Sequence, residues 1–126
     1  MKADPVGFEL NRIVTAGDTC QITMNFHEDD VPVDKSGSEF FYTAKSNKAD
    51  ADSAAVIAIE PASVVNQNSG KAGGVNDQVV ITLTATNTTL TAGNYYHDIQ
   101  EVEGAVVVTI AEGILQITAG VTIRTT

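Results

Sequence analysis

Hydrophobic and polar residues alternate along several short segments of the chain, and residues 19–26 show the pattern most clearly. Every second position in that segment is apolar: Cys20, Ile22, Met24 and Phe26. A period of two is typical of a β-strand with one face in the core and the other in water. Residues 39–45 and 78–83 alternate in the same way. Each face of 39–45 carries an aromatic side chain, so the sequence does not decide which of the two faces points into the core.

Other apolar segments predict further strands, which turn residues separate at intervals of roughly 8–12 positions. These segments are 8–14, 56–59, 94–102, 106–110, 114–118 and 121–123. Glu103-Gly104 and Glu112-Gly113 are predicted as hairpin turns, and residues 84–92 as a single helical turn. Residues 62–76 begin with a short apolar piece and continue as a loop rich in Gly and Asn.

The stretch from residue 90 to residue 99 places a glycine turn directly before an aromatic strand. In immunoglobulin-like sandwiches, a tyrosine near the start of the sixth strand donates its hydroxyl to the backbone a few residues upstream. Tyr95, two residues after Gly93, occupies that position, and Leu90 is predicted to pack inward. These three residues form the predicted structural corner.

Together these patterns predict an all-β fold, an antiparallel immunoglobulin-like β-sandwich of roughly seven to nine short strands. A jelly roll or a partly closed barrel produces the same pattern and remains the alternative. The length of 126 residues suits one core, so residues 1–126 are predicted as a single domain. Residues 1–12 are predicted as an N-terminal arm or an edge strand. The absence of Trp and of a cysteine pair separates the chain from antibody-type domains.

Charge narrows the range of partners. With 16 acidic and 7 basic residues the formal net charge is −9, which repels phosphate backbones and anionic membrane surfaces. We therefore predict neither nucleic acid nor membrane as a partner, and no apolar run is long enough to predict a membrane span. Because Cys20 is the single cysteine, an internal disulfide is excluded, which is consistent with assembly in a reducing cytosol. Cys20 itself is predicted as a buried strand residue.

The sequence carries no motif that predicts catalysis or cofactor binding. Residues 69–74 contain a Gly-Lys pair but lack the spacing of a phosphate-binding loop, and no hydrolase elbow or zinc-binding helix is present. Of the two histidines, His27 ends a predicted strand. His97 shares a strand face with Tyr95 and Ile99, which predicts a packed structural role. We expect no enzymatic activity and no cofactor.

Two polar connectors carry the carboxylates that come nearest to a metal site. Calcium takes oxygen ligands from flexible loops, but neither connector has the spacing of an EF-hand, so no specific metal site is predicted. The calcium candidates are Asp29, Asp30, Asp34, Asp50 and Asp52. The alternative function that they suggest is a carbohydrate- or host-surface-binding module assisted by calcium.

The order of the motifs is similar to that of a known family. The motifs are Gly17-Asp18-Thr19, Val31-Pro-Val-Asp34, Ser36-Gly37, residues 79–83, Leu90-Thr-Ala-Gly-Asn-Tyr-Tyr-His-Asp-Ile99, and a final hairpin at 112–117. This order resembles the immunoglobulin-like domains of tailed-bacteriophage virion proteins, notably the N-terminal domain of baseplate upper proteins, and small stand-alone phage structural proteins.

The resemblance implies a non-enzymatic structural subunit, a capsid decoration protein or a minor head, neck or tail accessory protein. Its partners would be other virion proteins, which it would contact in many copies. Its location would be the virion, after synthesis in the host cytoplasm. No fibre or coiled coil follows the domain in this sequence, and this favours an accessory subunit over a baseplate adaptor.

Overall fold

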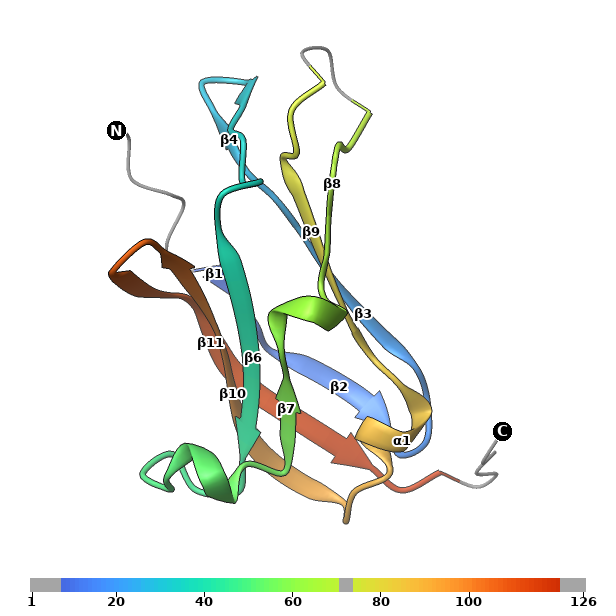
Figure 1. The fold of residues 1–126 in the computed structure, drawn as a ribbon. Coiled ribbons are helices and arrows are strands. Elements are labelled where there is room, and N and C mark those ends of the chain that lie inside the picture. Colours follow the sequence, from blue (N-terminus) through green and yellow to red (C-terminus); the bar gives the residue numbers. More distant parts are fainter. Residues whose placement is uncertain (1–7, 71–73, 121–126) are drawn as a thin grey trace.

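The computed structural model describes residues 8–70 and 74–120, which fold mainly as β-strands (Figure 1). The described part contains eleven strands, three of them only two residues long. Their bounds are β1 Phe8–Glu9, β2 Arg12–Thr15, β3 Cys20–Asn25, β4 His27–Glu28, β5 Val31–Pro32, β6 Glu39–Lys45, β7 Ile57–Ile59, β8 Val65–Gln67, β9 Gln78–Leu83, β10 Gly93–Glu103 and β11 Val106–Thr118. The other elements are the 3₁₀ turns η1 Asp52–Ala54 and η2 Pro61–Ser63 and the helix α1 Ala85–Thr88. No helix in the described ranges is long and apolar enough to cross a membrane.

The strands form two facing sheets and one separate hairpin (Figure 1). The larger sheet has the order β1-β11-β10-β6-β7, with β2 also paired to β11, and the smaller sheet has the order β3-β9-β8. All pairs are antiparallel except those of β1 and β2 with β11. The two sheets share no strand pair within the described residues, which distinguishes the fold from a closed barrel. Three strands, β11-β10-β6, facing β3-β9-β8 is the arrangement of an immunoglobulin-like sandwich, so the predicted fold class is confirmed.

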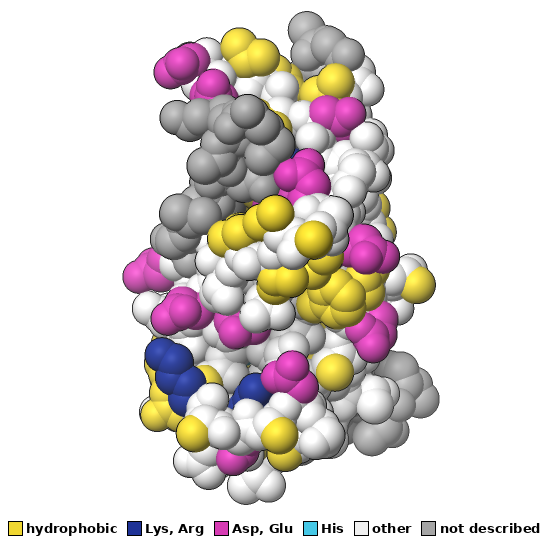
Figure 2. Space-filling model, turned by 60° about the vertical axis from the view of Figure 1, so that its left-hand side comes forward, with side chains coloured by type: hydrophobic (Ala, Val, Ile, Leu, Met, Phe, Trp, Pro, Cys, Tyr) yellow, Lys and Arg dark blue, Asp and Glu magenta, His cyan; other side chains and the backbone are white. Residues whose placement is uncertain are grey.

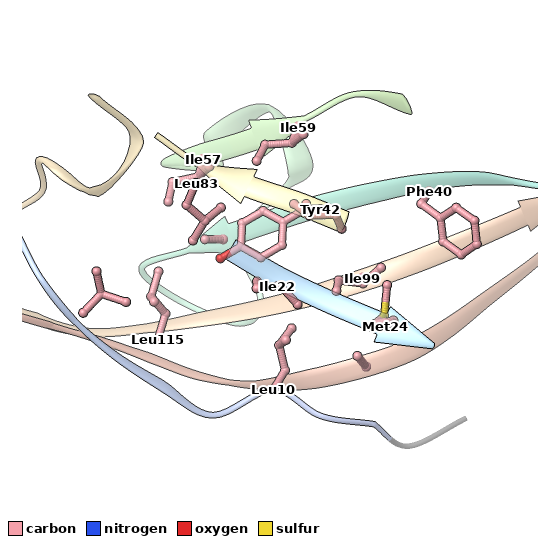
Figure 3. Close-up of a cluster of buried hydrophobic side chains, with 14 of the residues drawn as sticks. Leu10, Ile22, Met24, Phe40, Tyr42, Ile57, Ile59, Leu83, Ile99 and Leu115 are labelled. Atoms are coloured by element: carbon pink, nitrogen blue, oxygen red, sulfur yellow. The ribbon is translucent and has the colours of Figure 1, made fainter. Parts of the chain in front are cut away.

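The core lies between the two sheets, and alternate side chains of the longer strands β3, β6, β9, β10 and β11 point into it (Figure 3). The structure settles the inner face of β6, which the sequence left open: Phe40, Tyr42 and Ala44 are each at most 1% exposed. Phe41 lies on the outer face of the larger sheet and is half-buried. From the smaller sheet, Ile22 is among the residues that pack against this layer.

The hairpin formed by β10 and β11 contains one of the two predicted turns. Glu103 pairs with Val106, so Gly104 and Ala105 form a two-residue loop. Gly104 has φ +61° and Ala105 does not have a positive φ, which favours a type II′ turn. The prediction of a second turn at Glu112-Gly113 is wrong, and with it the predicted hairpin at 112–117, because β11 continues without interruption through both residues.

Gly113 is explained by close packing. The chain passes from β1 to β2 beside it, and a Cβ on Gly113 would lie 2.8 Å from the Leu10 carbonyl carbon and 2.9 Å from the Asn11 nitrogen. Asn11 Oδ1 also accepts a hydrogen bond from the Ile114 backbone nitrogen at 2.9 Å. A glycine inside a strand often marks such a close approach of another backbone segment.

The Gly113→Ala substitution should lower the free energy of unfolding by about 2 kcal/mol, because backbone atoms of the N-terminal strands must move to admit the methyl group. Urea denaturation of the purified domain measures the change. The matched control is Gly37→Ala, since a Cβ at Gly37 meets nothing within 4 Å. Equal effects of the two substitutions would contradict the packing explanation.

Other segments differ from the prediction in detail. Strand β8 lies within residues 62–76, where only a short apolar piece and a loop were predicted. The segment 8–14 forms two strands that both run parallel to β11, and the pairing is interrupted between them at Leu10 and Asn11, beside Gly113. Helix α1 confirms the helical turn within 84–92. The predicted strand 121–123 and the first seven residues of the predicted arm lie outside the described residues.

Candidate functional site

The predicted corner lies at the start of β10. The Tyr95 hydroxyl donates a hydrogen bond to the Thr91 carbonyl oxygen at 2.6 Å, and the side chain is 9% exposed. Gly93 has φ +153°, a conformation that L side chains rarely adopt. Leu90 is partly buried against the core. The arrangement is that of a tyrosine corner, which fixes the chain where it enters the larger sheet.

Substituting Tyr95 with phenylalanine should lower the free energy of unfolding by about 0.5–1.5 kcal/mol, since one hydrogen bond is lost while the packed ring remains. Thermal or chemical denaturation measures the change. Tyr96→Phe is the matched control, because the Tyr96 side chain points outward and is 41% exposed. A Tyr95→Phe variant as stable as the control would show that the corner bond contributes nothing.

His97 is held by two hydrogen bonds inside the sandwich. The Leu10 carbonyl oxygen can only accept, so His97 Nε2 carries the proton and donates to it. Nδ1 therefore accepts from the Tyr42 hydroxyl at 2.7 Å. Burial lowers the pKa of His97 to about 4, which keeps the ring neutral at pH 7. This neutral imidazole ties the N-terminal segment to β10 and β6, which agrees with the structural role predicted for it.

A second buried polar cluster lies farther along β10 and was not predicted from the sequence. Lys35 Nζ is 2.7 Å from Glu101 Oε2, and the Ser38 hydroxyl donates to the same oxygen at 2.6 Å. The Lys35 and Glu101 side chains are 2% and 3% exposed. The ammonium also lies 4.9 Å from the centre of the Phe26 ring. This cluster joins the connector before β6 to the larger sheet.

His27 and Asp77 form a third structural contact. His27 Nε2 lies 2.7 Å from Asp77 Oδ2, and Ser69 donates to the same carboxylate through its backbone nitrogen and its hydroxyl. Burial raises the pKa of Asp77, but the hydrogen bonds from Ser69 and His27 outweigh it and lower the pKa to about 2. The ionised carboxylate therefore connects the loop between β8 and β9 to His27 in β4.

The structure does not assemble the five calcium candidates into one site. The Asp34 carboxylate accepts hydrogen bonds from Ser36 and from the Asn76 backbone nitrogen, which lower its pKa. Asp29 and Asp30 are exposed at the tip of the β4–β5 hairpin, whereas Asp50 and Asp52 lie near Lys45 in the connector between β6 and β7. Within residues 8–70 and 74–120, no three His, Cys, Asp or Glu side chains are placed to hold a metal ion.

Cys20 is half-buried at the start of β3, so the prediction of a buried residue is only partly right. Burial raises the pKa of its thiol, with a smaller opposing effect from the charge of Arg12. A raised pKa reduces the fraction of reactive thiolate. The environment therefore gives this thiol no activation.

The outer face of the larger sheet carries a hollow of about 210 Å³ between β6, β10 and β11. Lys45, Tyr96, Asp98 and Glu112 are among its lining residues, and Asp98 lies directly opposite Glu112 in the strand register. Burial raises the pKa of the Asp98 carboxyl. Figure 2 shows the side on which β10 and β11 lie in Figure 1, with hydrophobic side chains grouped among acidic ones and basic side chains conspicuous near the lower end.

The strand order and the tyrosine corner place this chain in the class of immunoglobulin-like β-sandwich domains. A scan against protein-family models finds no match, and no curated protein matches the chain. One similar solved structure comes from structure-based site-directed photo-crosslinking analyses of multimeric cell-adhesive interactions of VGSC beta subunits. The similarity covers 95% of this chain and 98% of that chain, with a TM-score of 0.34 and 9% sequence identity. A likeness this distant carries no argument about function.

Proposed function

We propose that this chain is a non-enzymatic structural subunit of a tailed-phage particle, a capsid decoration protein or a minor head, neck or tail accessory protein. The observation that carries the proposal is that the buried ionisable groups of this chain connect segments of the fold to one another. His97, Asp77 and Glu101 each connect one segment of the fold to another. Among the described residues these groups serve to hold the sandwich together, as a structural subunit requires.

The resemblance in motif order supports the phage assignment, apart from the hairpin at 112–117, which is part of the continuous strand β11. The corner hydrogen bond of Tyr95 belongs to the motifs that remain. A subunit that binds a particle in many copies needs only modest contact at each site, because avidity increases the overall strength of attachment. The net charge of −9 suits attachment to basic surfaces of neighbouring proteins and disfavours contact with packaged nucleic acid.

The test is to locate the protein in purified particles by mass spectrometry with copy-number measurement and by electron microscopy. A copy number that matches the capsid lattice supports a decoration protein, and a small ring stoichiometry supports a neck or tail component. Absence of the protein from intact particles would overturn the proposal.

A second candidate function is binding of carbohydrate or of a host surface, favoured by the hollow on the outer face of the larger sheet. Tyr96 offers a half-exposed ring, and Gln100 and Asp98 offer hydrogen-bonding groups beside it. A glycan array with and without chelator tests this function, with Tyr96→Ala as the variant. Binding that Tyr96→Ala abolishes supports the candidate, and loss of signal with chelator supports its calcium-assisted form. No glycan signal would remove it.

A further inference from the structure

The tip of the β10–β11 hairpin exposes a run of residues without polar side chains. Gly104, Ala105, Val106 and Val107 are consecutive and all exposed, and the two valines retain 61% and 57% of their accessible surface. A run of this kind is unfavourable in a soluble domain unless it serves a function. We call residues 104–107 the hairpin tip.

The geometry of the hairpin tip indicates the shape of its partner. Val106 and Val107 are successive strand residues, so their side chains point to opposite faces of the hairpin. A flat surface can bury only one of them, whereas a cleft can receive both. The two-residue turn at Gly104 and Ala105 keeps the tip short, so little conformational entropy is lost when it is bound.

The charges around the hairpin tip indicate the chemistry of the partner. Glu103 lies opposite Val106, and Glu39 on β6 lies opposite Val102, which in turn pairs with Val107. The segments 39–44 and 99–109 contain no Lys or Arg. A partner whose cleft is bordered by basic side chains would therefore meet complementary charges, which favour both encounter and correct orientation.

We propose that the hairpin tip is a docking finger that inserts into an apolar cleft with a basic rim on another protein. A second copy of this chain fits less well, since its net charge is −9 and its own hollow on the larger sheet is lined by Asp52, Asp98 and Glu112 as well as by two lysines. The inference goes beyond the proposed function, because it does not depend on the particle in which the partner is found.

A cyclodextrin titration followed by NMR tests the chemistry of the finger. Amino-substituted β-cyclodextrin provides an apolar cavity with a basic rim, and neutral and carboxymethyl β-cyclodextrins provide the same cavity with other rims. We expect amide shifts centred on residues 102–108, with an affinity about tenfold higher for the amino form than for the carboxymethyl form and weaker binding at high salt.

The variant Val106→Lys/Val107→Lys should lose this binding by about tenfold or more, since it removes both apolar side chains and adds like charge to the probe. Val65→Lys is the matched control, because Val65 is an exposed strand valine of the smaller sheet. This variant should bind the amino-substituted cyclodextrin as tightly as the parent protein does. Thermal melts of both variants establish that they fold.

Three results would overturn the proposal: no shifts at the hairpin tip, equal binding of the three cyclodextrins, or equal losses in the Val65→Lys control. Self-association that maps to the tip without any probe would overturn it in favour of a second copy. Incorporation of the two variants into purified particles is a separate measurement. Exclusion of the double variant alone supports both proposals, whereas absence of the parent from particles overturns only the proposed function.

Discussion

The Glu101→Leu substitution should lower the free energy of unfolding by about 3–5 kcal/mol, because it removes the carboxylate that lies 2.7 Å from the buried Lys35 ammonium. Removing one member of a buried ion pair costs far more than the pair contributes, since the remaining charge has already lost its hydration. The Ser38 hydroxyl loses its acceptor in the same variant. Urea denaturation monitored by tyrosine fluorescence measures the change.

Replacing the whole cluster separates this desolvation effect from a packing effect. The variant Lys35→Met/Ser38→Ala/Glu101→Leu removes the charges and the hydroxyl together, and we expect it to regain about 2 kcal/mol relative to Glu101→Leu alone. Glu39→Leu is the surface control, since Glu39 is exposed on the neighbouring strand, and it should change stability by less than about 0.5 kcal/mol. A triple variant no more stable than the single variant would contradict the explanation.

Much of the fold could be predicted from the sequence because the alternating segments are also the paired strands. The segments around β3, β6 and β9 combine a period of two with flanking turn residues, and each forms a strand in which buried positions alternate with more exposed ones. The corner could be predicted for a different reason, since a glycine followed closely by a tyrosine is a local signal that requires no knowledge of distant residues.

The error at Gly113 arose because one residue type answers two physical needs. Glycine is favoured in turns, but it is also required where another backbone segment leaves no room for a Cβ. The sequence does not show that Leu10 and Asn11 lie beside Gly113, and the structure does. The register shift between Ile99 and Gln100 added to the difficulty, because it places Ile110 and Ala111 in succession on the buried side and breaks the alternation.

The Lys35–Glu101 cluster could not be paired from the sequence, because its members lie 66 positions apart and Lys35 belongs to a polar connector. A partial signal was present in β10. Glu101 continues the phase of Tyr95, His97 and Ile99, all of them buried, so a carboxylate at this position predicts a buried cation. The sequence can show that such a partner is needed without showing which residue supplies it.

The stability of the domain should fall by about 3 kcal/mol as the pH decreases from 6.5 to 4, because of His97. Burial lowers its pKa from 6.5 to about 4 in the folded state, although the hydrogen bond to the Leu10 carbonyl oxygen opposes the shift. Between these values the unfolded chain binds a proton and the folded chain does not, so protonation favours unfolding. Above pH 6.5 the stabilisation that comes from the lowered pKa of His97 is fully present, and below pH 4 the protonation of His97 causes no further loss of stability.

A His97→Gln variant isolates this effect, since glutamine can donate to the Leu10 carbonyl oxygen and accept from Tyr42 but does not titrate. We expect the parent to lose stability more steeply than the variant between pH 6.5 and 4.5. This range lies above the window from 3.8 to about 2 in which the lowered pKa of Asp77 makes its own contribution to stability depend on pH. Asp98 acts in the opposite direction because its folded pKa is raised, so Asp98→Asn is introduced into both proteins. Nitrogen-detected NMR of the imidazole gives the pKa and the tautomer directly. Parallel pH profiles, or a ring that carries its proton on Nδ1, would contradict the hydrogen-bond assignment on which the prediction depends.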